Sequence, residues 1–367
     1  MLKRLLTLSI MLAALAGAVP GHAYANCDPR TPPSAPKTED LGGDFANVTG
    51  HWMAPANNAD PTTLIVFFHG YGNDSSSWIC HMVDASNHGA LSFGLDYTGT
   101  GWPGPNNDQP PSNDRGWFVR EGALDSMALA RYFLDTYPTI NRVIAFGISM
   151  GGNSSGYAVA QGATRADGTP LFDYWFDVEG VTNLTEEYVL ASAVAPANAY
   201  AQGAVEDINK ECGDNYTNNA LCLSALTVTA HAQAIASFTK GLVVVHGVDD
   251  GLVPTNQSRE LSTAVRALGT PVEQYTVLRR NDCPDDDAQC IKDQGGTTLS
   301  ENVGTPLFAQ LGLGPYPRPL AGHGWEGSDS QLVIKTGFDR LWDLVDNQDA
   351  VPQNAEFVVD SGIGTLP

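Results

Sequence analysis

The chain has 367 residues, of which 43% are hydrophobic and 16% are charged, and its formal net charge is −22 at pH 7. This length and apolar content suffice for one large core, and no internal repeat or low-complexity linker divides the chain. The excess of acidic residues argues against nucleic acids and anionic membranes as partners.

The amino terminus has the features of a signal peptide. Lys3 and Arg4 precede the apolar run from Leu5 to Val19, and Ala23-Tyr24-Ala25 matches a small-x-small cleavage site. The apolar run is too short for a membrane span. We therefore expect residues 1–25 to be removed, leaving a protein without a stable membrane anchor that is secreted or periplasmic.

An even number of cysteines follows the predicted signal peptide, which is typical of disulfide bonds in an oxidising compartment. Six cysteines allow fifteen pairings. Proximity in the sequence favours Cys212 with Cys222 and Cys283 with Cys290, which leaves Cys27 for Cys80. No CxxC spacing or histidine pair accompanies them, so we expect neither a metal site nor another cofactor.

Continuous apolar runs predict buried strands, and segments with helical spacing of apolar residues lie among them. The expected strands are 64–68, 90–95, 143–148, 191–195, 242–246 and 272–278, and the clearest helices are 121–137, 255–268 and 328–345. This alternation predicts an α/β fold with a doubly wound, mostly parallel sheet. Its functional site should lie at the carboxyl ends of the strands.

The pentapeptide Gly147-Ile148-Ser149-Met150-Gly151 follows the expected strand 143–148 and precedes a helix-like segment. It has the form of a nucleophile elbow, a sharp strand-to-helix turn that exposes the serine Oγ. Glycines are needed there because larger side chains would collide with neighbouring backbone. Ser149 is therefore the candidate nucleophile.

Three further motifs follow the chain order that such an elbow requires. His69-Gly70-Tyr71-Gly72 comes directly after the strand 64–68, and the segment from His246 to Pro254 comes after the strand 242–246. Of the eight histidines only His323 lies beyond that segment, in Ala321-Gly322-His323-Gly324-Trp325.

Together these motifs resemble the alpha/beta-hydrolase superfamily, in its prolyl-oligopeptidase-like and dienelactone-hydrolase-like branch, over roughly residues 60–346. The segment 246–254 is similar to the HGxxDxxVP acid loop of that branch, which implies Asp250 as the triad acid; Asp249 is one residue out of register. The resemblance also implies His323 as the catalytic histidine, with an oxyanion hole formed by Met150 and Tyr71. The Tyr71 ring would either clamp the substrate's acyl group or pack as a partly buried turn residue.

The resemblance implies a serine hydrolase that acts through an acyl-enzyme, but it does not fix the reaction within the superfamily. Because esters react readily through this machinery, we favour a small-molecule or polymeric carboxylic ester, with a polyester or a plant-derived ester as the substrate considered. A serine peptidase of related fold and a non-catalytic binding protein of hydrolase fold are the alternatives. The oligomeric state stays open.

The expected domain organisation has three parts after the signal peptide. An arm of residues 26–59 precedes a catalytic domain of residues 60–350, and a loosely attached tail, 351–367, ends the chain. Insertions at 163–190, 198–238 and 281–320 are expected to form a cap or to shape the substrate cleft.

Overall fold

The computed structural model describes residues 27, 33–56, 60–97, 116–197, 199–212, 216–248, 250, 252–277, 323 and 332–359. The signal peptide predicted for residues 1–25 lies outside these residues. So do Asp249 and the whole of the expected insertion 281–320 with the pair Cys283 and Cys290.

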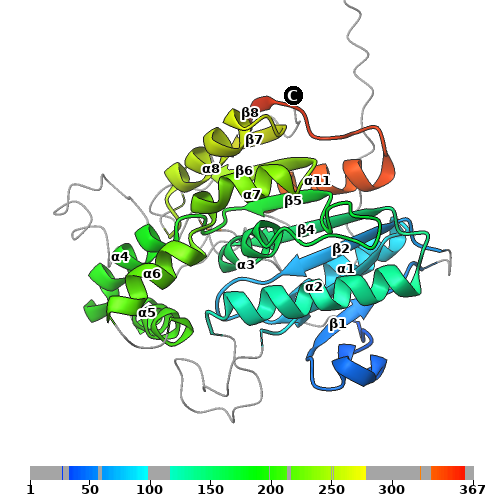
Figure 1. The fold of residues 1–367 in the computed structure, drawn as a ribbon, viewed down its shortest axis with the longest axis horizontal. Helices are drawn as coiled ribbons and strands as arrows, with labels where there is room; N and C mark the ends of the chain where they lie inside the picture. The colour runs from blue at the N-terminus through cyan, green and yellow to red at the C-terminus, as the bar shows by residue number, and fades with distance from the viewer. Residues whose placement is uncertain are drawn as a thin grey trace, which may run out of the picture.

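The described residues build one twisted eight-stranded sheet (Figure 1). The spatial order is β1-β3-β2-β4-β5-β6-β7-β8; β1 pairs antiparallel with β3, and every other pair is parallel. The fold class predicted from the sequence is therefore confirmed. The strands are β1 (Gly50–Met53), β2 (Thr63–Phe68), β3 (Leu91–Leu95), β4 (Arg142–Ile148), β5 (Tyr174–Val178), β6 (Gly241–Gly247), β7 (Val272–Val277) and β8 (Ala355–Val359).

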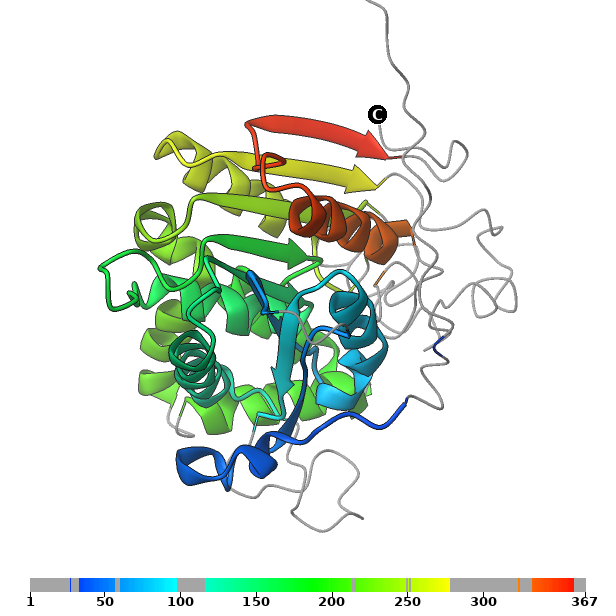
Figure 2. The same ribbon diagram turned by 90° about the vertical axis from the view of Figure 1, so that its right-hand side faces the viewer.

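Helices cover both faces of this sheet (Figure 2). One apolar cluster joins the sheet to α1 and α11, and the other joins it to α2, α3, α7 and α8. Because the central strands are buried on both faces, they carry continuous apolar runs instead of an alternating pattern. The α-helices are α1 (Ile79–Asn87), α2 (Val119–Thr136), α3 (Met150–Ala160), α4 (Leu184–Val194), α5 (Ala199–Glu211), α6 (Tyr216–Leu226), α7 (Ala232–Ser237), α8 (Thr255–Ala267) and α11 (Leu332–Asp346).

No single helix of the described residues has the length and hydropathy of a membrane span. The consecutive helical segments Ala220–Leu226 and Val228–Ser237, which are bent by 63° relative to each other, reach that length and composition only when they are taken together.

Helices α4, α5 and α6 form a separate group at one end of the molecule, which we call the cap (Figure 1). A disulfide between Cys212 and Cys222 links the end of α5 to α6, and a second joins Cys27 to Cys80 in α1. Both pairings agree with the expectation from sequence proximity.

The expected strand 191–195 is wrong, because Ala191 to Val194 belong to helix α4. An apolar run of this length does not distinguish a strand from a buried helix, and alanine favours the helix. The local signal was upstream: Asn183 caps α4 by accepting a hydrogen bond from the backbone N–H of Glu186, 3.1 Å away.

The central strand that the sequence analysis did not predict is β5, which lies inside the expected insertion 163–190. Asp177 interrupts its apolar run of aromatic and β-branched residues, so the run is short. Residues 174–178 of that segment are therefore part of the central sheet, whereas residues 184–190 begin helix α4 of the cap. The expected insertion 198–238 does contain α5 and α6 of the cap.

Both ends of the described chain also contribute strands. The expected arm 26–59 contains β1, which pairs with β3, and the tail predicted to be loosely attached contains β8, which pairs with β7. Burial alternates along the edge strand β8, but an apolar residue, Val358, occupies an exposed position, so the sequence gives little periodic signal.

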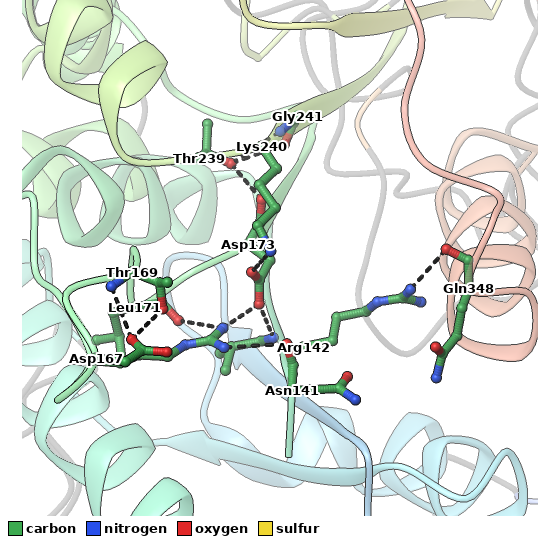
Figure 3. A network of polar contacts seen from close by, with 12 residues as sticks. Asn141, Arg142, Asp167, Thr169, Leu171, Asp173, Thr239, Lys240, Gly241 and Gln348 are labelled. Atoms are coloured by element: carbon green, nitrogen blue, oxygen red, sulfur yellow. Dashed lines mark hydrogen bonds and ion pairs between the residues drawn. The ribbon is translucent and has the colours of Figure 1, made fainter. Parts of the chain in front are cut away.

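A charged network fixes the amino ends of the central strands (Figure 3). The Asp173 carboxylate, 1% exposed, accepts from the backbone N–H of Val143 at 2.8 Å and pairs with Arg165 and with Lys240, whose Nζ is 2.6 Å away. Because Asp173 precedes β5, and Val143 and Lys240 belong to or precede its two neighbours, this carboxylate ties together three adjacent strands.

We expect Asp173→Asn to lower the free energy of unfolding by about 2–4 kcal/mol, because it leaves the largely buried guanidinium of Arg165 and the half-exposed Lys240 without their counter-charge. Urea titration of the variant and the wild type measures this difference. Equal transition midpoints would show that the network contributes no net stability.

Candidate active site

The backbone at Ser149 has the strained geometry of a nucleophile elbow. Ser149 lies between β4 and α3 with φ 58° and ψ −126°, a left-handed conformation that is rare for residues other than glycine. A Cβ at Gly147 would come within 2.2 Å of the carbonyl oxygen of Gly151, and a Cβ at Gly151 within 2.0 Å of that of Phe68. The glycines are therefore required by close approach of backbone to backbone.

Backbone hydrogen bonds join the elbow to the end of β5. The N–H of Ser149 donates to the carbonyl of Val178 at 3.1 Å, and the N–H of Val181 donates back to the carbonyl of Ser149 at 3.0 Å. The N–H of Glu179 donates to Val245 of β6 at 2.8 Å. The residues that follow β5 thus form a bridge between the elbow and β6, the strand that leads to Asp250.

Asp250 and His323 lie in direct contact at this end of the sheet. The Nδ1 atom of His323 is 2.8 Å from Oδ2 of Asp250, and both residues are almost fully buried. The other carboxylate oxygen, Oδ1, accepts from the backbone N–H groups of Leu252 and Val253, at 2.8 and 2.9 Å. Both oxygens of Asp250 are therefore held in place.

A second histidine shares the same carboxylate. Nε2 of His246 is 3.2 Å from Oδ2 of Asp250 and 3.0 Å from the carbonyl oxygen of Val253, while its Nδ1 is 2.5 Å from the hydroxyl of Ser258. A histidine that donates through Nε2 accepts the Ser258 proton at Nδ1 when it is neutral. His246 thereby helps to orient the Asp250 carboxylate through Oδ2, the same oxygen that contacts His323.

These contacts determine the charge of Asp250. Its burial raises the pKa, but the charges and hydrogen bonds of His323 and His246 outweigh this and hold the pKa well below its ordinary value. Burial lowers the pKa of His246, and the hydrogen bond and charge of Asp250 outweigh this and raise it. Asp250 is therefore ionised at neutral pH, as a carboxylate that supports an imidazolium must be.

A second carboxylate faces the same edge of His323. Oε2 of Glu179 is 3.8 Å from Nδ1 of His323, and Oε1 accepts from the backbone N–H of Gly247 at 3.2 Å. Glu179 is fully buried, and its φ of 49° is again in the left-handed region. Neither the motifs nor the chain order pointed to this residue.

Tyr71 is engaged by the cap. Its side chain is 5% exposed, its hydroxyl donates to Oδ2 of Asp207 in α5 at 2.8 Å, and its ring centroid lies 5.8 Å from that of Trp117. The indole N–H of Trp117 donates in turn to Asn153 of α3 at 3.2 Å. Of the two alternatives for the Tyr71 ring, these contacts favour packing.

Three other buried carboxyl groups lie in this half of the molecule. Burial raises the pKa of Asp177 to about 7, against the opposing charge of His246. Burial, with the charge of Asp250, raises the pKa of Glu187 to about 8, and burial raises that of Glu211 to about 7. Neither oxygen of Asp177 has a hydrogen-bond partner among the described residues.

The structure thus brings Asp250 and His323 together and places Ser149 at the carboxyl end of β4, two strands from the loop that carries Asp250. Met150 is the first residue of α3, where backbone N–H groups lack intrahelical partners. Tyr71 lies beyond the end of β2, the strand adjacent to β4. Asp249 is outside the described residues.

Comparison with family models identifies the prolyl oligopeptidase family over residues 77–281, more than half of the chain. Comparison with curated protein sequences gives no match.

Among solved structures, a puromycin-hydrolysing peptidase of Mycobacterium tuberculosis is similar over 91% of this chain and 42% of its own, with a TM-score of 0.54 and 15% identity. An acylaminoacyl peptidase of Pyrococcus horikoshii matches 62% of this chain and 34% of its own, with a TM-score of 0.44 and 17% identity. A carboxyl esterase of Bacillus coagulans matches 62% and 84%, with a TM-score of 0.44 and 14% identity. The chain spans about a third of the acylaminoacyl peptidase.

Asp177→Asn should change how stability depends on pH. The native state keeps the Asp177 proton up to about pH 7 while the unfolded chain loses it near pH 4, so the wild-type free energy of unfolding falls across this interval by up to about 4 kcal/mol from this group alone. Asparagine removes that contribution. Urea midpoints at pH 4.5 and 7.5 test this; a stability difference between variant and wild type that stays constant with pH would contradict it.

Tyr71→Phe removes the hydrogen bond to Asp207 while it retains the backbone N–H at position 71. We expect stability to fall by about 1–3 kcal/mol, because the acceptor is a buried carboxylate. Limited proteolysis should cut the variant faster within α4 to α6. Unchanged proteolysis would mean that other contacts hold the cap.

Proposed function

The chain belongs to the prolyl oligopeptidase family and is a serine hydrolase, and from this premise we propose that it hydrolyses carboxylic esters through a triad of Ser149, His323 and Asp250. The activity proposed is that of an esterase, with an acyl-enzyme formed on Ser149.

One observation carries the proposal, the hydrogen bond of 2.8 Å between Nδ1 of His323 and Oδ2 of Asp250. It joins two residues that are 73 positions apart in the sequence, at the carboxyl ends of the strands, where the elbow also lies. A buried ion pair of this kind is costly unless its hydrogen bonds are satisfied, and here the carboxylate accepts from two backbone N–H groups as well. Such an arrangement supports a catalytic histidine.

In the proposed mechanism Asp250 keeps the proton of His323 on Nδ1, so Nε2 accepts the proton of Ser149 Oγ as the oxygen attacks the ester carbonyl. The backbone N–H groups of Met150 and Tyr71 would stabilise the oxyanion. The imidazolium then protonates the leaving alcohol, and water hydrolyses the acyl-enzyme by the same steps.

The proposal includes export. Two disulfides, Cys27 with Cys80 and Cys212 with Cys222, agree with an oxidising compartment. The basic and apolar sequence of residues 3–19 supports a signal peptide. For an exported hydrolase, the substrate that we propose is a polyester or a plant-derived ester, and its test follows once esterase activity on small esters is established.

Family membership favours a second candidate, a serine peptidase, because the matched family is one of oligopeptidases. The same nucleophile, base and oxyanion donors act on amides. The two candidates differ in the leaving group that the site protonates, and therefore in the substrates that separate them.

The first test compares nitrophenyl esters of short and long acyl chains with peptide nitroanilides, on the protein and on Ser149→Ala. Ester turnover that depends on Ser149 and exceeds amide turnover supports the esterase. Preferential amide turnover would replace it with the peptidase. Without turnover of either class, labelling of Ser149 by a fluorophosphonate would indicate a narrow substrate range, and absence of labelling would overturn the proposal.

Among triad variants, Ser149→Ala should abolish turnover and His323→Ala should lower kcat by at least about a thousandfold. Asp250→Asn should cost about a hundredfold or more, whereas Asp249→Asn should cost less than about tenfold. Steady-state kinetics of the four variants test the assignment. An equal or larger loss at Asp249 would move the acid to that residue.

A further inference from the structure

The histidine of the proposed triad has two carboxylates on one edge. Asp250 lies 2.8 Å from Nδ1 of His323 and Glu179 lies 3.8 Å from the same atom. One oxygen of each carboxylate and one ring nitrogen all lie within 4.8 Å of one another. Asp250 comes from the loop after β6 and Glu179 from the end of the adjacent strand β5.

The fold holds Glu179 in this place at an energetic cost. Its φ of 49° is unfavourable for a residue with a Cβ, and its carboxylate is completely removed from solvent. Hydrogen bonds compensate from both ends of the residue: its N–H donates to Val245, and its Oε1 accepts from Gly247. Both partners belong to β6, so the carboxylate is fixed against the strand that leads to Asp250.

The other carboxylate oxygen, Oε2, lies 3.8 Å from Nδ1 of the imidazole. We propose that Glu179 is a positioning residue for His323, a second carboxylate that fixes the ring and stabilises its cationic form during turnover. The inference rests on the triad proposed above. No proton moves to Glu179: His323 receives the Ser149 proton at Nε2 and keeps its own on Nδ1, where both carboxylates attract the resulting charge.

The charge arrangement supports this role. A full negative charge at 3.8 Å favours the imidazolium by about tenfold or more even when it is strongly screened. Among the residues that the structure describes, the titratable groups that interact with His323 are Asp250, Glu179 and Glu187 of α4, with His246 on the far side of Asp250. Glu179 also contributes to the raised pKa of His246. Of the carboxyl groups other than Asp250, only Glu179 has a described contact with the ring within 4 Å.

The test uses Glu179→Gln, which preserves size and the acceptor for Gly247. We expect kcat to fall about tenfold with KM changed less than twofold. We also expect the acidic limb of the pH dependence of kcat to move to lower pH, because loss of a nearby negative charge destabilises the imidazolium of His323. Asp173→Asn is the matched control: it alters a buried carboxylate at the opposite end of β5 and should leave the limb in place.

The second measurement is the rate of Ser149 labelling by a fluorophosphonate, which needs no knowledge of the substrate. Glu179→Gln should slow labelling more in an Asp250→Asn background than in the wild type, because Glu179 is then the remaining carboxylate beside Nδ1. If Glu179→Gln does not fold, Glu179→Asn replaces it, since asparagine accepts a left-handed φ.

The outcomes separate this inference from the proposed function. If the wild type reacts at Ser149 but the Glu179 variants have wild-type rates in both backgrounds, Glu179 has no positioning role and the triad stands. A loss of rate with an unmoved acidic limb would also overturn the inference, because it would indicate structural damage only. If the wild type does not react at Ser149, both proposals fail.

Discussion

The carboxylate of Asp250 is the group on which this end of the molecule depends. A buried negative charge must be compensated, and here two backbone N–H groups and two histidines do so. His246 belongs to β6 and is itself held by hydrogen bonds to Val253 and to Ser258 of α8. His323, in contrast, comes from a segment 73 residues beyond Asp250. Compensation of one charge therefore fixes where the chain must return to the sheet.

Much of the fold follows from the sequence because buried parallel strands leave a strong pattern. The runs that became β2, β4 and β6 are fully buried on both faces, and each leads directly into a loop with a recognisable motif. The need for glycine at positions 147 and 151 was also predictable from the elbow motif, because backbone atoms approach these positions too closely for a Cβ. The sequence failed where burial was the only signal, since alanine-rich α4 resembles a buried strand and β5 is broken by Asp177.

The parts of the site that sequence did not predict are relations between distant residues. Tyr71 and Asp207 are 136 positions apart, and no local pattern links them. Glu179 lies in no motif, and its closeness to His323 follows only from the place of β5 between the strand before the elbow and the strand before Asp250. The signal available in principle was a glutamate where the left-handed backbone favours glycine or asparagine, and that conformation is visible only in the structure.

The bond between Tyr71 and Asp207 makes the cap and the loop after β2 energetically dependent on each other. A ligand that displaces α5 must also supply the free energy of breaking this hydrogen bond. By reciprocity, a ligand that binds more tightly when α5 contacts Tyr71 stabilises the loop after β2. For the esterase proposed above, contact of an acyl group with the cap would be coupled through this bond to the loop that carries the proposed oxyanion donor Tyr71. Changes far from Ser149 that alter which substrates fit should then alter turnover as well as affinity.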